Sequence, residues 1–268
     1  MKKLSLLSLA LLGVMFISNC KKDPKGSGTP TPTETPKQRA VAIYFGGTWC
    51  PPCGAYGKPA KEQLVNALKD DVILISCQLN SSSVTDPMNC PDANSLAGGF
   101  GVSGVPTMFT GGANEIMKGV SSGTAMGSTA TANAQATLAL PAFANISGTA
   151  TISGGTITVN TKTKFLKDQA EEYMVAAYVL EDGITATQSS DASTKKNIHD
   201  RVLRTKLSST VFGETIGSNF KSGDSKDKTF TATLNSSWNA ANLSVAIVLW
   251  RKNTDGKVTM CNGVNVKL

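Results

Sequence analysis

Residues 40–54 read AVAIYFGGTWCPPCG, and this stretch decides the fold that the sequence predicts. Its first six residues form an apolar run of strand length, and the two glycines after them are typical of a buried strand that ends at a turn. Two cysteines separated by two residues follow, and residues 58–70 then place Leu64, Ala67 and Leu68 at helical spacing. The predicted order is therefore strand, turn, Cys-x-x-Cys and helix.

This order has a chemical consequence for Cys50 and Cys53. A helix N-terminus presents unpaired N–H groups and a partial positive charge, which favour a thiolate over a thiol. The spacing of the two cysteines also brings their sulfurs within bonding distance at a helix start. We therefore expect Cys50 to act as the catalytic nucleophile and Cys53 to resolve the mixed disulfide.

Two other uses of this cysteine pair can be weighed against redox exchange. A zinc site needs a second close pair of ligands, but Cys77 and Cys90 are far apart in the sequence and the chain has one histidine. A purely structural disulfide gains little from closing so short a loop. The residues favour redox exchange, and we expect neither a metal nor a cofactor.

A second motif lies downstream, in the segment GVPTMF at residues 104–109. A proline at the start of an apolar run marks the first residue of a strand or an edge. The Trp-Cys-Pro-Pro-Cys motif together with this Gly-Val-Pro-Thr resembles the thioredoxin superfamily, over about residues 39–140. The resemblance implies that Pro106 is cis and lies beside the cysteine pair, with the Val105 backbone offered to an extended substrate. We expect Trp49 to form a wall of that substrate groove rather than part of the core.

One residue departs from the pattern of that superfamily. Thioredoxins place a buried acid six residues before the first active cysteine, and this chain has Tyr44 there, which implies slow turnover. Pro51 and Pro52 have no N–H group with which to stabilise a Cys50 thiolate. We therefore expect a reductase or isomerase, with a potential nearer about −270 mV than about −120 mV.

The N-terminus indicates export. Lys2 and Lys3 precede an apolar run that ends in Ser-Asn-Cys at residues 18–20, which is typical of a lipoprotein signal peptide at residues 1–19. Cys20 is then the lipid anchor that attaches the chain to a membrane. Residues 20–38 are rich in Pro, Lys, Gly, Ser and Thr and form a flexible linker.

The charge of the chain excludes one class of partner. Removing the signal peptide lowers the formal net charge from +7 to +5, and no basic run is interleaved with aromatic residues, so we expect no nucleic acid partner. Export places the chain where disulfides persist. The expected partners are exported proteins with cysteines or disulfides and a redox partner that supplies electrons.

The composition changes near residue 142. Residues 39–141 mix strand-like and helix-like runs, whereas residues 142–268 are rich in Thr, Val, Ser and Asn and alternate in polarity. The sequence thus predicts an α/β thioredoxin-like domain followed by an antiparallel β-sandwich-like, all-β domain. The segments that we expect to be strands in the second domain are 149–153 and 156–160, joined by a diglycine turn, and 173–180, 243–250 and 264–268.

The second part of the chain carries a further resemblance. Its motifs AYVLEDGI at residues 177–184, His199 with Val-Leu-Arg at 202–204, and Gly-Glu at 213–214 are similar to those of the outer membrane protein twenty-eight related family. This resemblance implies a lipid-anchored protein of the cell envelope, at the outer membrane of a Gram-negative bacterium. We interpret His199 as a hydrogen-bonded structural residue, and Arg201 and Arg204 as a solvated or ion-paired face.

Three cysteines remain outside the active pair. Cys77 ends an apolar run and Cys90 lies in an irregular insertion, so a structural disulfide between them would tie the insertion to the sheet. A buried free Cys77 is the alternative. We expect Cys261 to be a small buried hydrophobic residue.

Two functions stay open at this point. The first is a thiol–disulfide oxidoreductase that acts on exported proteins. The second is a surface or periplasmic binding lipoprotein that keeps the thioredoxin-like scaffold without significant turnover. The intact Cys-x-x-Cys favours the first function, whereas Tyr44 and the large second domain favour the other.

Overall fold

The computed structural model describes residues 37–112, 115–118 and 123–268. The predicted signal peptide, the Cys20 anchor and nearly all of the linker lie outside these residues. The described chain is rich in strands, with fourteen strands and three α-helices. None of the described helices is both long and apolar enough to cross a membrane.

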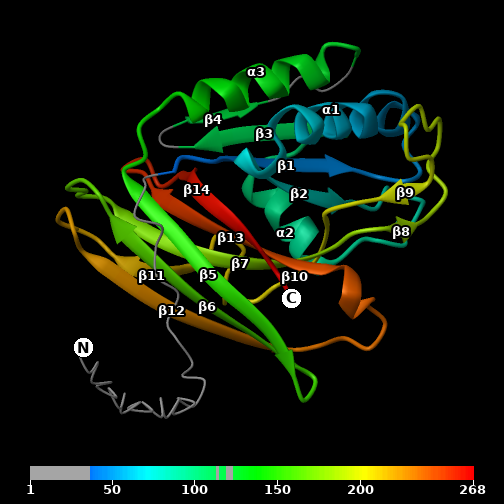
Figure 1. Cartoon of the computed structure of the whole chain (residues 1–268). Coiled ribbons are helices and arrows are strands. Elements are labelled where there is room, and N and C mark those ends of the chain that lie inside the picture. The colour runs from blue at the N-terminus through cyan, green and yellow to red at the C-terminus, as the bar shows by residue number, and fades with distance from the viewer. Residues whose placement is uncertain (1–36, 113–114, 119–122) are drawn as a thin grey trace, which may run out of the picture.

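A nine-stranded mixed sheet organises the molecule (Figure 1). Its strands run in the order β14-β13-β7-β10-β2-β1-β3-β4, and β11 pairs with β7 beside this row. β1 and β2 are parallel, β2 and β10 are parallel, and the other pairs are antiparallel. The bounds of these strands are Ala40–Gly46 (β1), Val72–Gln78 (β2), Thr107–Gly112 (β3), Glu115–Lys118 (β4), Glu172–Glu181 (β7), Val202–Lys206 (β10), Glu214–Gly217 (β11), Leu243–Lys252 (β13) and Val258–Lys267 (β14).

Three helices cover this sheet near β1. α1 (Lys58–Leu68) and α3 (Met126–Leu138) pack on one face, where Ala40, Ala42 and Tyr44 point. The alternating residues of β1 point to the other face, where α2 (Pro91–Gly99) packs. The first strand is therefore covered on both faces, as its continuous apolar run predicts.

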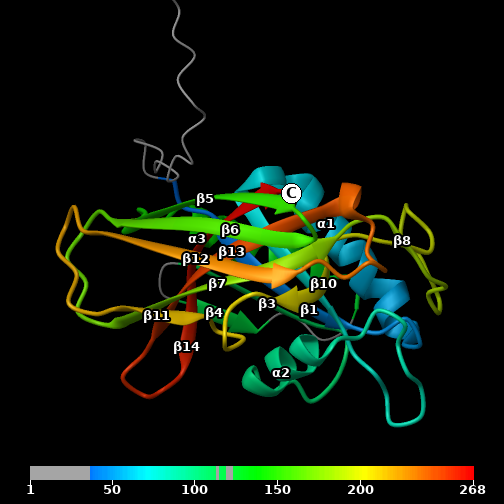
Figure 2. The same ribbon diagram turned by 90° about the horizontal axis from the view of Figure 1, so that it is seen from below.

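A second, three-stranded sheet packs against the other end of the large sheet. It consists of β5 (Ala144–Ser153), β6 (Thr156–Phe165) and β12 (Ser225–Thr233), all antiparallel, and it lies over β7 and β13 (Figure 2). The predicted hairpin with its diglycine turn is confirmed as β5 and β6. The predicted strands at 173–180, 243–250 and 264–268 are confirmed within β7, β13 and β14.

The predicted fold class is wrong. We expected an α/β thioredoxin-like domain followed by a β-sandwich-like domain, but Val202 of β10 pairs with Ser76 of β2. This pairing joins the strands from both parts of the sequence into one sheet. The core shows the same continuity, because Trp250 and Tyr178 belong to the apolar cluster that contains Phe45. The result is a β-rich fold.

Candidate functional site

The cysteine pair lies where β1 leads into the first helix. Cys50 and Cys53 form a disulfide with their Cα atoms 5.2 Å apart. The backbone N–H of Cys53 lies 3.1 Å from the carbonyl oxygen of Cys50 and 3.2 Å from its Sγ. Residues 53–57 form a π-helical turn before α1 begins, and Pro59 occupies the first turn of α1. The π-helical turn leads directly into α1, and Pro59 is tolerated in this first turn, where its missing N–H group matters least.

The cis-proline that was predicted beside this disulfide is present. The peptide bond between Val105 and Pro106 is cis, and the carbonyl oxygen of Val105 lies 3.7 Å from Cys50 Sγ. Trp49 is half-buried and its indole N–H donates to the carbonyl oxygen of Leu79 over 2.8 Å. The structure therefore brings Val105 and Pro106, more than 50 residues away in sequence, to the disulfide beside Trp49.

The disulfide is nevertheless buried. Cys50 is 2% exposed and Cys53 is 1% exposed, whereas the expected role of Cys50 as a nucleophile needs an accessible sulfur. Residues 188–195, here called the cover segment, lie against the backbone around the two cysteines. They belong to the connection between β8 (Ile184–Thr185) and β9 (Ile198–His199).

The cover segment is bonded to the backbone around the cysteines. The side-chain amide of Gln188 donates to the carbonyl oxygens of Gly47 and Cys50, over 3.1 and 3.2 Å. Ser189 N donates to Thr48 O over 2.8 Å. Three backbone carbonyl oxygens of the motif thus accept hydrogen bonds from a segment more than 130 residues away in sequence, which holds the cover segment against the motif.

Gly54 explains how closely the cover segment approaches. Ala192 N donates to the Gly54 carbonyl oxygen over 3.1 Å. A Cβ atom added at Gly54 would lie only 2.0 Å from the carbonyl oxygen of Ser189. No side chain fits between these two stretches of backbone, so the contact requires glycine at this position.

Tyr44 occupies the position at which the resemblance places a buried acid. It is 1% exposed, and burial raises the pKa of its hydroxyl far above the usual value. The Lys61 ammonium lies 4.5 Å from the centre of the Tyr44 ring and donates to Ser76 Oγ over 2.8 Å. A neutral phenol and a lysine thus stand in place of the proton acceptor.

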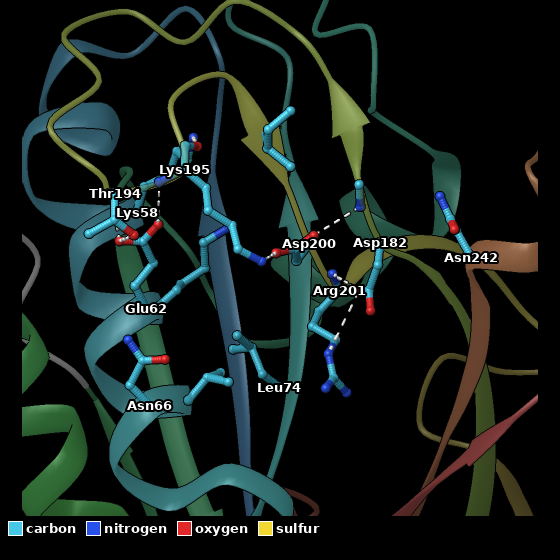
Figure 3. A pocket seen from close by; sticks show the side chains of 14 residues that line it. Lys58, Glu62, Asn66, Leu74, Asp182, Thr194, Lys195, Asp200, Arg201 and Asn242 are labelled. Carbon is cyan, nitrogen blue, oxygen red and sulfur yellow. Dashed lines mark hydrogen bonds and ion pairs between the residues drawn. The ribbon is translucent and has the colours of Figure 1, made fainter.

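A pocket lies on the far side of the cover segment, between α1 and residues 182–201 (Figure 3). Its volume is about 410 Å³, which falls in the range of small-molecule sites, roughly 300–1,000 Å³. Lys58 lines it and bonds Asp191 over 2.7 Å. Glu62 of α1 accepts hydrogen bonds from the backbone N–H groups of Thr194 and Lys195. The same segment therefore covers the disulfide and forms a wall of the pocket.

The structure places the three residues that were interpreted as structural or ion-paired, and of these Arg201 lines the pocket. His199 is 1% exposed, and its Nε2 donates to the carbonyl oxygen of Ala186 over 3.0 Å. Burial lowers the pKa of His199 to about 4, helped by the charge of Lys61. Arg201 lines the pocket and lies 3.7 Å from Asp182, and Arg204 bonds Glu181 over 2.6 Å in a mostly buried ion pair.

The predicted disulfide between Cys77 and Cys90 is wrong, because both are free thiols. Cys77 lies in the apolar core, where burial raises its pKa. Cys90 directly precedes α2, and its Sγ lies 3.5 Å from the carbonyl oxygen of Leu203 in β10. The insertion is held instead through α2, whose Asp92 accepts hydrogen bonds from Thr205 and Lys206. Cys261 is a buried free thiol.

Neither the cover segment nor the pocket could be predicted directly from the sequence. Residues 182–201 are polar and rich in Ser, Thr, Lys and Asp, a composition that indicates only a loop. One signal lay in the helix, where Lys58, Lys61 and Glu62 follow the cysteines at helical spacing. That spacing places charged side chains on neighbouring positions of one helix, but it does not say which segment they meet.

Comparison with known proteins places the chain in a family. Its residues 93–267 match the family model described as Outer membrane protein Omp28. The matched model is not a thioredoxin-superfamily model, so that part of the resemblance is not supported by it. Comparison with curated proteins finds no match.

Solved structures with a similar fold are known. HBP35 of Porphyromonas gingivalis has a TM-score of 0.65 at 17% identity, over 87% of this chain and 76% of that one. Protein AGR_C_4864 from Agrobacterium tumefaciens has a TM-score of 0.54 at 14% identity, over 87% of this chain and 96% of that one. These likenesses concern the β-rich fold alone. The family match covers more than half of the sequence, and the chain therefore belongs to the Omp28 outer membrane protein family, whose location is the cell envelope.

Proposed function

We propose that this chain is a binding lipoprotein of the cell envelope, anchored through Cys20, that takes a small ligand into the pocket between α1 and the cover segment. In this proposal the Cys50–Cys53 disulfide is structural. It fixes the start of the first helix and the backbone on which the cover segment lies. The protein binds its ligand without significant disulfide turnover.

One observation carries this proposal. The cover segment is bonded to Gly47, Thr48, Cys50 and Gly54 on one side and lines the pocket on the other. A thiolate that attacks this disulfide must reach a sulfur atom, but Cys50 and Cys53 are almost fully buried. Exchange needs an accessible sulfur, so it requires the cover segment to open, whereas ligand binding does not.

A second candidate function is thiol–disulfide exchange with exported proteins, driven by a redox partner that supplies electrons. The contact between Cys50 Sγ and the Val105 carbonyl, next to the cis bond, favours it. By the resemblance noted above, an extended substrate would lie along Val105 once the cover segment had moved. The two candidates differ in whether this movement occurs readily.

Protection of the disulfide from reduction tests the proposal. Dithiothreitol should reduce the Cys50–Cys53 bond in the native protein at least about 100-fold more slowly than in guanidinium chloride, a protection of roughly 3 kcal/mol. Equal rates in the two conditions would refute a sealed disulfide. Alkylation of the freed thiols followed by mass spectrometry gives the rate.

Two glycine variants sharpen this experiment. Gly54→Ala inserts a methyl group where Ser189 O lies at 2.0 Å, so it should displace the cover segment and speed reduction at least tenfold. Gly98→Ala makes the same change on α2, where no atom lies within 4 Å of the added Cβ. It should leave the rate unchanged. Slow reduction in Gly54→Ala would mean that the cover segment is not what protects the disulfide.

A further inference from the structure

Lys61 differs from the other cations of the pocket. Lys58 pairs with Asp191 over 2.7 Å, and Lys195 pairs with Asp200 over 2.9 Å. Among the described residues, no carboxylate lies within 4.0 Å of Lys61 Nζ. Lys61 is only 6% exposed, so the pocket wall contains a buried ammonium without an anionic partner.

An unpaired buried ammonium is costly, because burial removes its hydration. Burial, together with the nearby charge of Lys58, lowers the pKa of Lys61 to about 8. Other charged or titratable groups face Lys61 from each element around it, namely Glu62 on α1, Tyr44 on β1, Cys77 on β2, and Asp191, His199 and Asp200 from residues 182–201. Together, these groups leave the charged form of Lys61 destabilised. An anion beside Nζ would stabilise the charged form again.

The Lys61 ammonium has more N–H donors than its hydrogen bond uses. A lysine ammonium has three N–H donors, and the hydrogen bond of Lys61 is to Ser76 Oγ over 2.8 Å. The Tyr44 ring occupies one side at 4.5 Å. At least one donor is therefore open to a group that enters the pocket, whose lining includes Lys61.

The charges of the pocket set the charge of the ligand. The other cations in the lining, Lys58, Lys195 and Arg201, each face a carboxylate of Asp191, Asp200 or Asp182. Glu62 is the remaining anion and is used by the backbone of the cover segment. Among the described residues, Lys61 is thus the lining cation that has no carboxylate within 4.0 Å. A ligand with one negative charge can pair with it, whereas a doubly charged phosphate would leave a second charge without a cation.

Part of the remaining wall is apolar. Leu74 is buried, and Val65 and Ile198 are half-buried beside it in the pocket lining. A ligand with a single anionic end and a short hydrocarbon body satisfies both parts of the pocket, because the apolar atoms leave water while the charge is paired. A volume of about 410 Å³ is ample for a chain of about six carbons.

We propose that this pocket binds a small organic monocarboxylate, with the carboxylate on the Lys61 ammonium and the hydrocarbon chain against Val65, Leu74 and Ile198. The proposal rests on the binding function proposed above and names its ligand class. Lys61 is then the residue that determines the charge of the ligand.

Calorimetric titration of the mature protein at pH 7 tests this assignment with hexanoate as the probe and hexanamide as its neutral counterpart. Hexanoate should bind at least tenfold more tightly than hexanamide. From propionate to hexanoate, each added methylene should tighten binding by up to about fourfold. Equal binding of hexanoate and hexanamide, or no binding of hexanoate, overturns the proposal.

Two lysine variants locate the site. Lys61→Met keeps the length of the side chain and removes its charge, so hexanoate should bind at least tenfold more weakly. Lys257→Met removes the same charge from a side chain that is 82% exposed and should bind as the wild type does. Unchanged affinity in Lys61→Met overturns the assignment. If hexanoate fails to bind while the disulfide stays protected from reduction, the ligand class is wrong and the binding function stands.

Discussion

The ammonium of Lys58 bonds the carboxylate of Asp191 over 2.7 Å, and the two side chains are only 5% and 6% exposed. This pair joins α1 to the cover segment. Asp191 also accepts the backbone N–H groups of Ser193 and Asn197, so one buried carboxylate organises the turn of the cover segment. The pair therefore links the helix that begins at the cysteines to the segment that buries them.

We expect Lys58→Met to destabilise the protein by about 3–5 kcal/mol, because it leaves the Asp191 carboxylate buried without its cation. Lys58→Met combined with Asp191→Asn should cost less than Lys58→Met alone, because the uncompensated charge is gone. Urea unfolding measures both free energies, with Lys257→Met as the exposed control. A loss below about 1 kcal/mol in Lys58→Met would contradict a buried, coupled pair.

A second prediction concerns pH. His199 is buried and neutral, and burial lowers its pKa from the usual 6.5 to about 4. A depressed histidine pKa means that the unfolded chain takes up the proton first. The contribution of neutral His199 to the free energy of unfolding is therefore complete above pH 6.5. It is lost as the pH falls from 6.5 to 4, by roughly 3 kcal/mol in all.

His199→Gln should remove this pH dependence, because glutamine does not titrate. Urea midpoints measured from pH 7 to pH 4 give the slope for both proteins. Asp191 does not interfere, because its hydrogen bonds hold its pKa below 3.8 against the effect of burial and its contribution is lost only at lower pH. An equal slope in the variant and the wild type would place the titrating group elsewhere.

The shared sheet leads to a third prediction. Trp250 is fully buried, donates to the Tyr178 hydroxyl over 3.1 Å and contacts the ring of Phe100. It therefore ties the late strands to the helix-covered part of the sheet. Trp250→Ala should cost about 3–5 kcal/mol and lower the stability of β1 and β13 by the same amount.

Hydrogen exchange of the β1 and β13 amides measures this coupling. One cooperative unit predicts a single unfolding transition for both strands. Two transitions, with β1 unaffected by Trp250→Ala, would show that the two parts of the chain unfold separately.

Local features of the fold could be predicted from the sequence. The diglycine turn and the alternating residues beside it predicted the β5–β6 hairpin, because side-chain alternation and turn chemistry are encoded within a few residues. The resemblance around Cys50 also placed Pro106 correctly, as a cis residue beside the disulfide. In the hairpin and at the cis-proline, the local geometry is determined by a short sequence motif.

Long-range pairing could not be predicted in this way. Nothing in residues 202–206 indicates that Val202 pairs with Ser76 of β2, and this single pairing overturned the two-domain fold. The cover segment was missed for a similar reason, since its hydrogen bonds join residues about 140 apart in sequence. The disulfide predicted for Cys77 failed because compartment and spacing do not fix which way a thiol points.

Insulin reduction tests the central claim, that Cys50 and Cys53 form a buried structural disulfide in a binding protein. The mature protein is mixed with insulin and dithiothreitol, and the precipitation of the insulin B chain is followed beside the Cys50→Ser variant. We predict that both proteins precipitate insulin no faster than dithiothreitol alone. A rate that rises with the concentration of the wild-type protein and is lost in Cys50→Ser would contradict this account and establish thiol–disulfide exchange.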